Sequence, residues 1–305
     1  MFYFLCKRLM LAWLVVLGVS LATFMVGHAT GDPVELMARE NASLEDKQQL
    51  RVYLGLDRPL AEQYLSFVAK AARGDLGFSF VQHTQVTDLI LERLPATLEL
   101  AAVGFVLALL IALPLGVIIA LKRNSFTDYL VSGLALVGQA SPGFWIGLML
   151  VAFFAVELRW LPVSGSGTAA HFVLPAITLA LQSAARLTRL VRASMINVLD
   201  ADYVRTARAK GLRERTVLLV HSLRGALIPV VTMAGLELAE LVSGAFITET
   251  IFAWPGVGRL AVTAVFQRDF PLIQGVVLLA AVFFVFINFI VDVLYVLIDP
   301  RVKLK

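Results

Sequence analysis

The chain has 305 residues, of which 59% are hydrophobic and 16% charged, with a formal net charge of +4. This composition is too apolar for a soluble domain, and no basic arm of the kind that binds nucleic acid is visible. The single cysteine, Cys6, excludes an internal disulfide. Apolar runs of bilayer-spanning length recur along the chain, so the sequence predicts an all-α integral membrane protein.

The first apolar run covers residues 9–27 and follows the cations Lys7 and Arg8. It is longer than the ~7–15-residue core of a signal peptide, which favours an uncleaved helix. Residues 30–96 are polar, with mixed charges, no spanning segment, and helical patterns near 61–72 and 85–94. We expect an N-terminal tail and helix in 1–29, an external region in 30–96 and a membrane core in 97–305. The external region is either a spacer or a part that acts in gating or receptor contact.

Three more spans are expected before residue 200. The second covers about 97–121 and the third about 130–156, where Ser141-Pro142-Gly143 should bend the helix. The fourth begins near Phe172 and should continue as a long helix to about Leu199. Its end would then carry three cations, Arg186, Arg189 and Arg192.

The most polar stretch between apolar runs covers residues 200–229. From Arg186 to Arg224 nine basic residues stand against three acidic ones, which leaves a local charge near +6. A loop that basic stays on the cytoplasmic side of a membrane. The same bias along the chain predicts six spans with both termini in the cytoplasm.

A short helix is expected inside this basic stretch. Asp200 and Asp202 are candidate N-caps, and Tyr203 and Ala207 stand four residues apart on one face. Gly211 can end the helix because glycine tolerates a left-handed backbone. By its residues alone, such a helix could dock into a groove on another protein or lie on anionic lipid.

The fifth span, about 225–247, contains Glu237 and Glu240, which are three residues apart and therefore on one helix face. A carboxylate in the middle of a bilayer costs roughly 2.5–3.5 kcal/mol, so it normally meets a partner or a water-filled path. We predict that the two carboxylates line a translocation path. The alternative is packing against arginine, serine or backbone groups of a neighbouring helix. The sixth span covers about 275–298.

No motif for enzymatic chemistry is present in the sequence. It has no G-x-x-x-x-G-K-[ST] phosphate loop, no nucleophile elbow, and four scattered histidines without ligand spacing. We therefore expect no catalytic residue, no metal site and no cofactor in this chain.

Residues 203–211, YVRTARAKG, resemble the coupling loop of ABC importer permeases, specifically the dipeptide/oligopeptide/nickel branch. Gly211 takes the place of the motif's glycine and Ala207 that of its second alanine. Arg205 and Thr206 replace the glutamate and first alanine of the general motif, as in the peptide branch's own version. Residues 250–260 also resemble the segment that follows the family's fifth helix.

The resemblance covers nearly the whole chain and implies a subunit that forms half of an ATP-driven import path. Partners would be a second homologous permease subunit, two ABC ATPase subunits that bind ATP and Mg²⁺, and a periplasmic or lipid-anchored solute-binding protein. The location would be the bacterial inner membrane. Within a coupling loop at 193–224, the residues implied to dock on an ATPase are Tyr203, Arg205, Thr206, Ala207, Arg208, Ala209, Lys210 and Gly211.

The expected substrates are di- and oligopeptides, with nickel chelates, glutathione and opines as alternatives within the same family. A different class of protein would be a proton-coupled secondary transporter that uses Glu237 and Glu240. That protein would transport alone in a pH gradient, whereas an ABC permease requires its ATPases.

Overall fold

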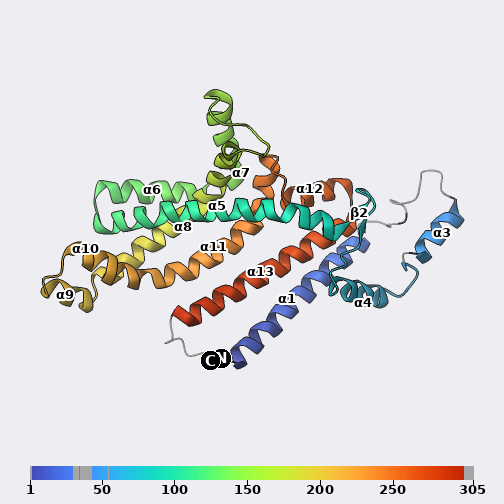
Figure 1. The fold of residues 1–305 in the computed structure, drawn as a ribbon, viewed down its shortest axis with the longest axis horizontal. Helices are drawn as coiled ribbons and strands as arrows, with labels where there is room; N and C mark the ends of the chain where they lie inside the picture. The colour runs from blue at the N-terminus through green and yellow to red at the C-terminus, as the bar shows by residue number, and fades with distance from the viewer. Residues whose placement is uncertain (1, 30–33, 35–42, 54, 299–305) are drawn as a thin grey trace. The chain divides into compact units, whose positions relative to one another are not determined.

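The computed structural model describes residues 2–29, 34, 43–53 and 55–298, and helices dominate it (Figure 1). The elements in chain order are α1 (Phe2–Ala29), α3 (Leu44–Tyr53), α4 (Leu60–Ala71), β1 (Phe78–Ser79), β2 (Thr84–Gln85), α5 (Val86–Leu121), α6 (Phe126–Ala140), α7 (Gly143–Leu150), the π-helix η1 (Val151–Glu157), α8 (Ala169–Leu199), α9 (Asp202–Ala209), α10 (Glu214–Thr216), the π-helix η2 (Val217–Ser222), α11 (Leu223–Ile251), α12 (Val257–Gln267) and α13 (Phe270–Ile298).

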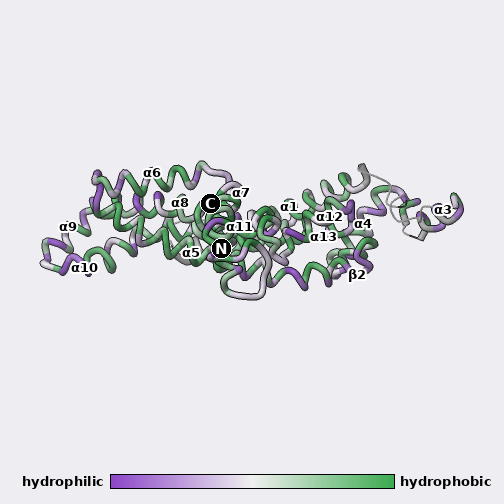
Figure 2. Tube along the Cα trace, turned by 90° about the horizontal axis from the view of Figure 1, so that it is seen from above, coloured by the Kyte–Doolittle hydropathy of each residue, from purple (hydrophilic) through white to green (hydrophobic). Residues whose placement is uncertain are grey.

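Several helices are long and apolar enough to cross a membrane. Figure 2 shows the hydrophobic residues, in green, along the chain. Four such stretches are found among the described residues: Met10–Gly27, Val86–Leu121, Glu214–Val242 and Phe270–Ile290. The pair Phe126–Ala140 and Gly143–Glu157 makes a fifth if it is one span bent by 106°. The predicted membrane class is confirmed. The fourth predicted span falls on α8, which does not meet this criterion.

The bend at Ser141-Pro142-Gly143 agrees with the sequence prediction, and a neighbouring helix supports it. Pro142 has the extended backbone of a cap residue (ψ 136°), so α7 starts in a new direction at Gly143. The Nε2 atom of Gln182 in α8 donates a hydrogen bond to the carbonyl of Ser141 at 2.8 Å. This bond satisfies a carbonyl at the break, which a membrane interior would otherwise leave unpaired.

Contacts divide the chain into two compact units. The first contains the described residues up to Pro95 together with Arg259–Val285. In it the Ser20 hydroxyl lies 2.8 Å from the Tyr64 hydroxyl, and Phe24 packs on the Tyr64 ring, so α1 and α4 are joined. The small hairpin β1–β2 was not expected from the sequence. The hydroxyl of its Ser79 donates to the buried carboxylate of Asp269.

The second unit contains Ala96–Gly258 together with the described part of the chain from Phe286 onward. Its centre is α8, which packs against α6, α7 and α11. Small side chains let α5 approach closely: Ala108 packs on Ala180 and Ala184, and a Cβ added at Gly116 would lie 2.5 Å from Val191. Close backbone approach at small residues is the usual way in which membrane helices associate.

Candidate functional site

The short helix expected in the basic stretch exists as α9, at one end of the α8–α11 pair (Figure 1). Its buried residues, Val204 and Ala207, form a cluster with Val217 of η2, and Val198 of α8 packs against that cluster. One face of α9 is therefore packed on α8 and on η2, the π-helix that continues into α11.

The other face of α9 is open. Arg205 keeps 71% of its side chain exposed, and Tyr203, Thr206, Arg208, Ala209, Lys210 and Gly211 are exposed as well. Among the eight residues that the resemblance implies in docking, Ala207 alone is buried. Tyr203 and Ala207 lie four residues apart on this helix, as predicted, but its buried residues are Val204 and Ala207, while Tyr203 is exposed.

The ends of α9 match the prediction only at the C-terminus. The cap prediction for Asp200 and Asp202 is wrong, because α8 continues to Leu199 and leaves two residues for the turn. Asp200 thus ends α8, Ala201 takes the N-cap position without a side-chain bond, and Asp202 lies in the first turn of α9. Gly211 has φ +73°, the left-handed backbone expected of it.

Ion pairs reduce the free positive charge around α9. Arg208 donates to both carboxylate oxygens of Glu214, at 2.7 and 3.3 Å, and this bonding raises the pKa of the Arg208 guanidinium above its usual value. A looser pair joins Arg123 to Asp200 at 3.7 Å. Because these groups are exposed, the pairs position side chains and contribute little stability.

The two carboxylates of the fifth span meet an arginine that sequence reasoning had placed nearer the membrane surface. Arg186 of α8 donates from Nε and Nη2 to the two oxygens of Glu237, each at 2.6 Å, and Nη2 also donates to Glu240 at 3.0 Å. Only 2% of the Glu237 side chain is exposed, against 64% for Glu240 and 26% for Arg186. We call these three residues the Arg186 triad. The alternative of an arginine partner thus describes Glu237, while Glu240 is open.

A second arginine pair holds the start of α6. Arg192 donates from Nε and Nη2 to Asp128, at 2.6 and 2.7 Å. Asp128 is buried and also accepts from the backbone N–H of Asn124 at 3.0 Å. The sequence analysis missed this pair because Asp128 reads as one more polar residue in a short loop.

At the other end of α11, Glu249 is completely buried. The Thr97 hydroxyl donates to its carboxylate at 2.6 Å, and the backbone N–H of Val257 donates to the same hydroxyl at 2.8 Å. A Cβ on Gly256 would overlap the Glu249 carboxylate, and one on Gly258 would overlap the Phe246 backbone. The segment that follows α11 is thereby fixed on α5 and α11.

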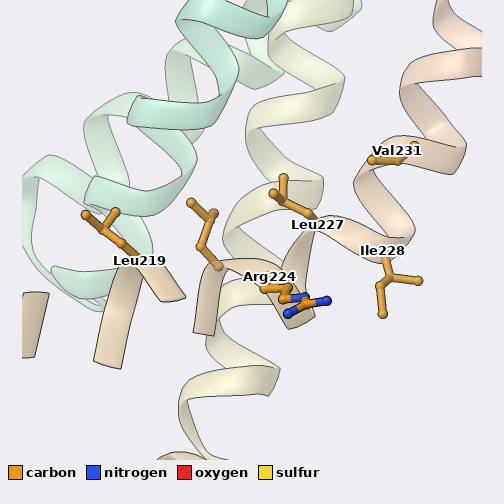
Figure 3. A pocket seen from close by; sticks show the side chains of 6 residues that line it. Leu219, Arg224, Leu227, Ile228 and Val231 are labelled. Atoms are coloured by element: carbon orange, nitrogen blue, oxygen red, sulfur yellow. The ribbon is translucent and has the colours of Figure 1, made fainter. Parts of the chain in front are cut away.

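An apolar groove of about 230 Å³ lies along η2 and the first turns of α11. Figure 3 shows its lining side chains, among which Arg224 is the charged one. Its other members are Leu219, Leu223, Leu227, Ile228 and Val231. The described residues contain no group of three or more histidine, cysteine or carboxylate side chains that could hold a metal ion.

Apolar spans, a bent helix pair and a short exposed helix at one end of two long helices define a helical membrane protein. Family models match along most of the sequence. "Binding-protein-dependent transport system inner membrane component" covers residues 112–304, and the N-terminal model of the same system covers residues 1–101. The chain belongs to this family and is a permease of ABC importers.

Curated relatives support the same assignment. The chain is 39% identical to the dipeptide transport system permease protein DppB of Escherichia coli (strain K12), with all of both chains covered. It is 42% identical to the glutathione transport system permease protein GsiC of the same strain, over 94% of each chain. It is 39% identical to the oligopeptide transport system permease protein AppB of Bacillus subtilis (strain 168), over 98% of this chain and 99% of the relative.

Solved structures share the fold. A chain of the MetNI methionine ABC transporter, in an inward-facing conformation, aligns with a TM-score of 0.59 at 18% identity. The alignment covers 69% of this chain and 96% of that one. A chain of an amino acid ABC transporter with histidines aligns with a TM-score of 0.52 at 20% identity, over 71% and 95%.

Proposed function

We propose that this permease forms half of the import path for di- and oligopeptides delivered by a solute-binding protein. The observation that carries the proposal is the pair of 39% identities to a dipeptide and an oligopeptide permease over essentially full length. The 42% identity to a glutathione permease makes glutathione the first alternative substrate. Nickel chelates and opines are further alternatives. Glu240, with Glu237 behind it, would line the path.

The energy would come from partner proteins. A second homologous permease subunit, two ATPase subunits that bind ATP and Mg²⁺, and a periplasmic or lipid-anchored binding protein complete the proposed importer. Residues 203–211 would dock on an ATPase, within a coupling loop at 193–224. The proposal is supported by the two faces of α9, one open and one packed on Val198 and Val217. ATP can drive transport in this way only by binding the two conformations of the importer unequally.

The proposed topology has six spans with both termini in the cytoplasm of the bacterial inner membrane. In it α8 is the remaining span. Its 31 residues would extend about 46 Å at 1.5 Å per residue, more than the ~30 Å of a bilayer core. Residues 1–29 would form the first helix, 30–96 the external region, and 97–305 the permease core.

Docking is tested best at Ala209, because it is exposed, whereas a change at buried Ala207 would first disturb the chain's own packing. In an importer reconstituted in proteoliposomes, Ala209→Glu should lower ATP-dependent peptide uptake at least tenfold. Far-UV circular dichroism of the subunit should be unchanged. Ala61→Glu, at an exposed alanine of α4, is the matched control and should transport normally. Normal uptake by Ala209→Glu would remove the docking role from this face.

A different measurement distinguishes the ABC importer from a proton-coupled secondary transporter. The purified chain alone, in vesicles with a pH gradient and no ATPase subunits, should accumulate no peptide. Accumulation under those conditions would replace the importer proposal with a secondary transporter.

A further inference from the structure

The Arg186 triad has an unbalanced charge. Two carboxylates against one guanidinium leave a formal charge of −1 near the middle of the 29-residue helix α11. An unbalanced charge on a membrane-spanning helix is unfavourable unless it meets water or a cation. The excess charge is carried by Glu240, because Glu237 has both oxygens bonded to Arg186 while Glu240 accepts one bond through Oε2.

Glu240 lies on a face of α11 that the unit leaves open. Leu236 and Ile247 on the same face are 43% and 56% exposed, and a Cβ added at Gly244 would meet nothing within 4 Å. Residues 236, 240, 244 and 247 follow helical spacing, so they form one stripe. The carboxylate therefore has open space beside it, one turn along the helix.

A buried hydroxyl near Glu237 is a second, independent observation that points to a polar ligand or water. Ser183 of α8 is completely buried, and its Oγ has no hydrogen-bond partner among the described residues. Leu179 shares a buried cluster with Leu241, and Leu187 shares one with Ala234. Ser183 lies between these two leucines on α8, on the face that packs against α5 and α11, and the matching level on α11 is near Glu237.

An unpaired buried hydroxyl is uncommon in proteins and points to a polar group from outside the chain. Ser183 would thus be available to water or to substrate when the packing of α8 on α11 loosens. The same movement would change how Arg186 holds its two carboxylates, because Arg186 comes three residues later on α8.

Together these observations assign a ligand chemistry to the site. We propose that Glu240 contacts the positively charged amino end of the substrate as it passes, and that Arg186 positions Glu240 through its Nη2 bond. This proposal rests on the proposed function and names which end of a peptide the path recognises. Glu237 anchors Arg186 and does not touch the substrate.

A first experiment tests the charge and accessibility of the site without any peptide. In a Cys6→Ser background, Gly244→Cys in the reconstituted importer is reacted with a trimethylammonium methanethiosulfonate and with a sulfonate methanethiosulfonate. Adding Glu240→Gln should lower the cation-to-anion ratio of reaction rates about threefold to tenfold. Glu157→Gln, at an exposed carboxylate outside α11, should leave the ratio unchanged. An unchanged ratio in Glu240→Gln, or no reaction with either reagent in any nucleotide state, would overturn the proposal.

A second experiment tests the substrate contact. Glu240→Gln should lower uptake of a dipeptide with a free amino group about tenfold. Uptake of the N-acetylated dipeptide, and ATP hydrolysis stimulated by the loaded binding protein, should keep their wild-type values. Equal loss for both peptides, or loss of the stimulated hydrolysis, would show a structural role and overturn the contact. If the wild-type importer takes up neither peptide, the proposed function fails, and the labelling ratio still decides whether the site favours cations.

Discussion

Replacing Asp128 by asparagine tests whether its pair with Arg192 holds α6 to α8. The carboxylate is almost fully buried, with 3% of its side chain exposed, and receives two short bonds from a guanidinium that is 29% exposed. Asparagine keeps the shape but removes the charge and turns an amide N–H₂ toward the Arg192 donors. Arg192 would then be left partly buried without a counter-charge.

The expected cost follows from this burial. Breaking one side of a buried pair costs about 3–5 kcal/mol, and the partial exposure of Arg192 lowers our expectation to about 2–3 kcal/mol. The measurement is unfolding of the purified protein by SDS in mixed micelles, followed by far-UV circular dichroism. Arg192→Gln and the double variant complete a cycle, in which the double variant should lose much less than the two single losses together.

Asp200→Asn is the matched control, since Asp200 also pairs with an arginine, Arg123, in the same part of the chain. That pair is 3.7 Å long, with side chains 70% and 55% exposed, so its loss should cost less than about 0.5 kcal/mol. Equal losses for Asp128→Asn and Asp200→Asn would refute the reasoning that burial and bidentate geometry determine the cost.

Two further predictions concern glycines. Gly211→Val places a β-branched residue at φ +73° and should destabilise the turn between α9 and α10 by about 1–2 kcal/mol. Trypsin should then cleave this segment faster than in wild type, whereas Gly211→Asn should resemble wild type. Slow cleavage of the valine variant would contradict the role of the left-handed backbone. The added methyl group of Gly258→Ala would overlap the Phe246 backbone and should lower the free energy of unfolding by about 1–3 kcal/mol. Gly244→Ala adds its methyl group in open space and should leave the free energy of unfolding nearly unchanged. Equal stability of these two alanine variants would contradict the close packing at Gly258.

Local signals in the sequence predicted the elements well. Apolar length located most of the spans, and a Ser-Pro-Gly sequence predicted the bend at residues 141–143, because proline removes a backbone donor wherever it stands. The helix end at Gly211 was also predicted from a local property, because glycine tolerates a left-handed backbone. Residues 85–94, for which the sequence predicted a helix, continue into the second span as a single helix, α5.

The long-range pairs could not be predicted from the sequence. Arg186 and Glu237 are 51 positions apart, and Asp128 and Arg192 are 64 apart. Hydropathy does not reveal which helices pack together, so the sequence analysis placed Arg186 among the cations at the end of the fourth span. The sequence analysis gave an arginine partner as one alternative for the two glutamates, but it could not say which arginine.

The bend between α6 and α7 has a consequence for how the protein is made. Each half contains about 15 residues, roughly 22 Å of helix, which is less than the ~30 Å of a bilayer core. The bond that satisfies the broken backbone comes from Gln182, 41 positions later in the chain. This hydrogen bond can form only after the ribosome has translated α8, so the carbonyl of Ser141 has to find another partner, such as water, until then.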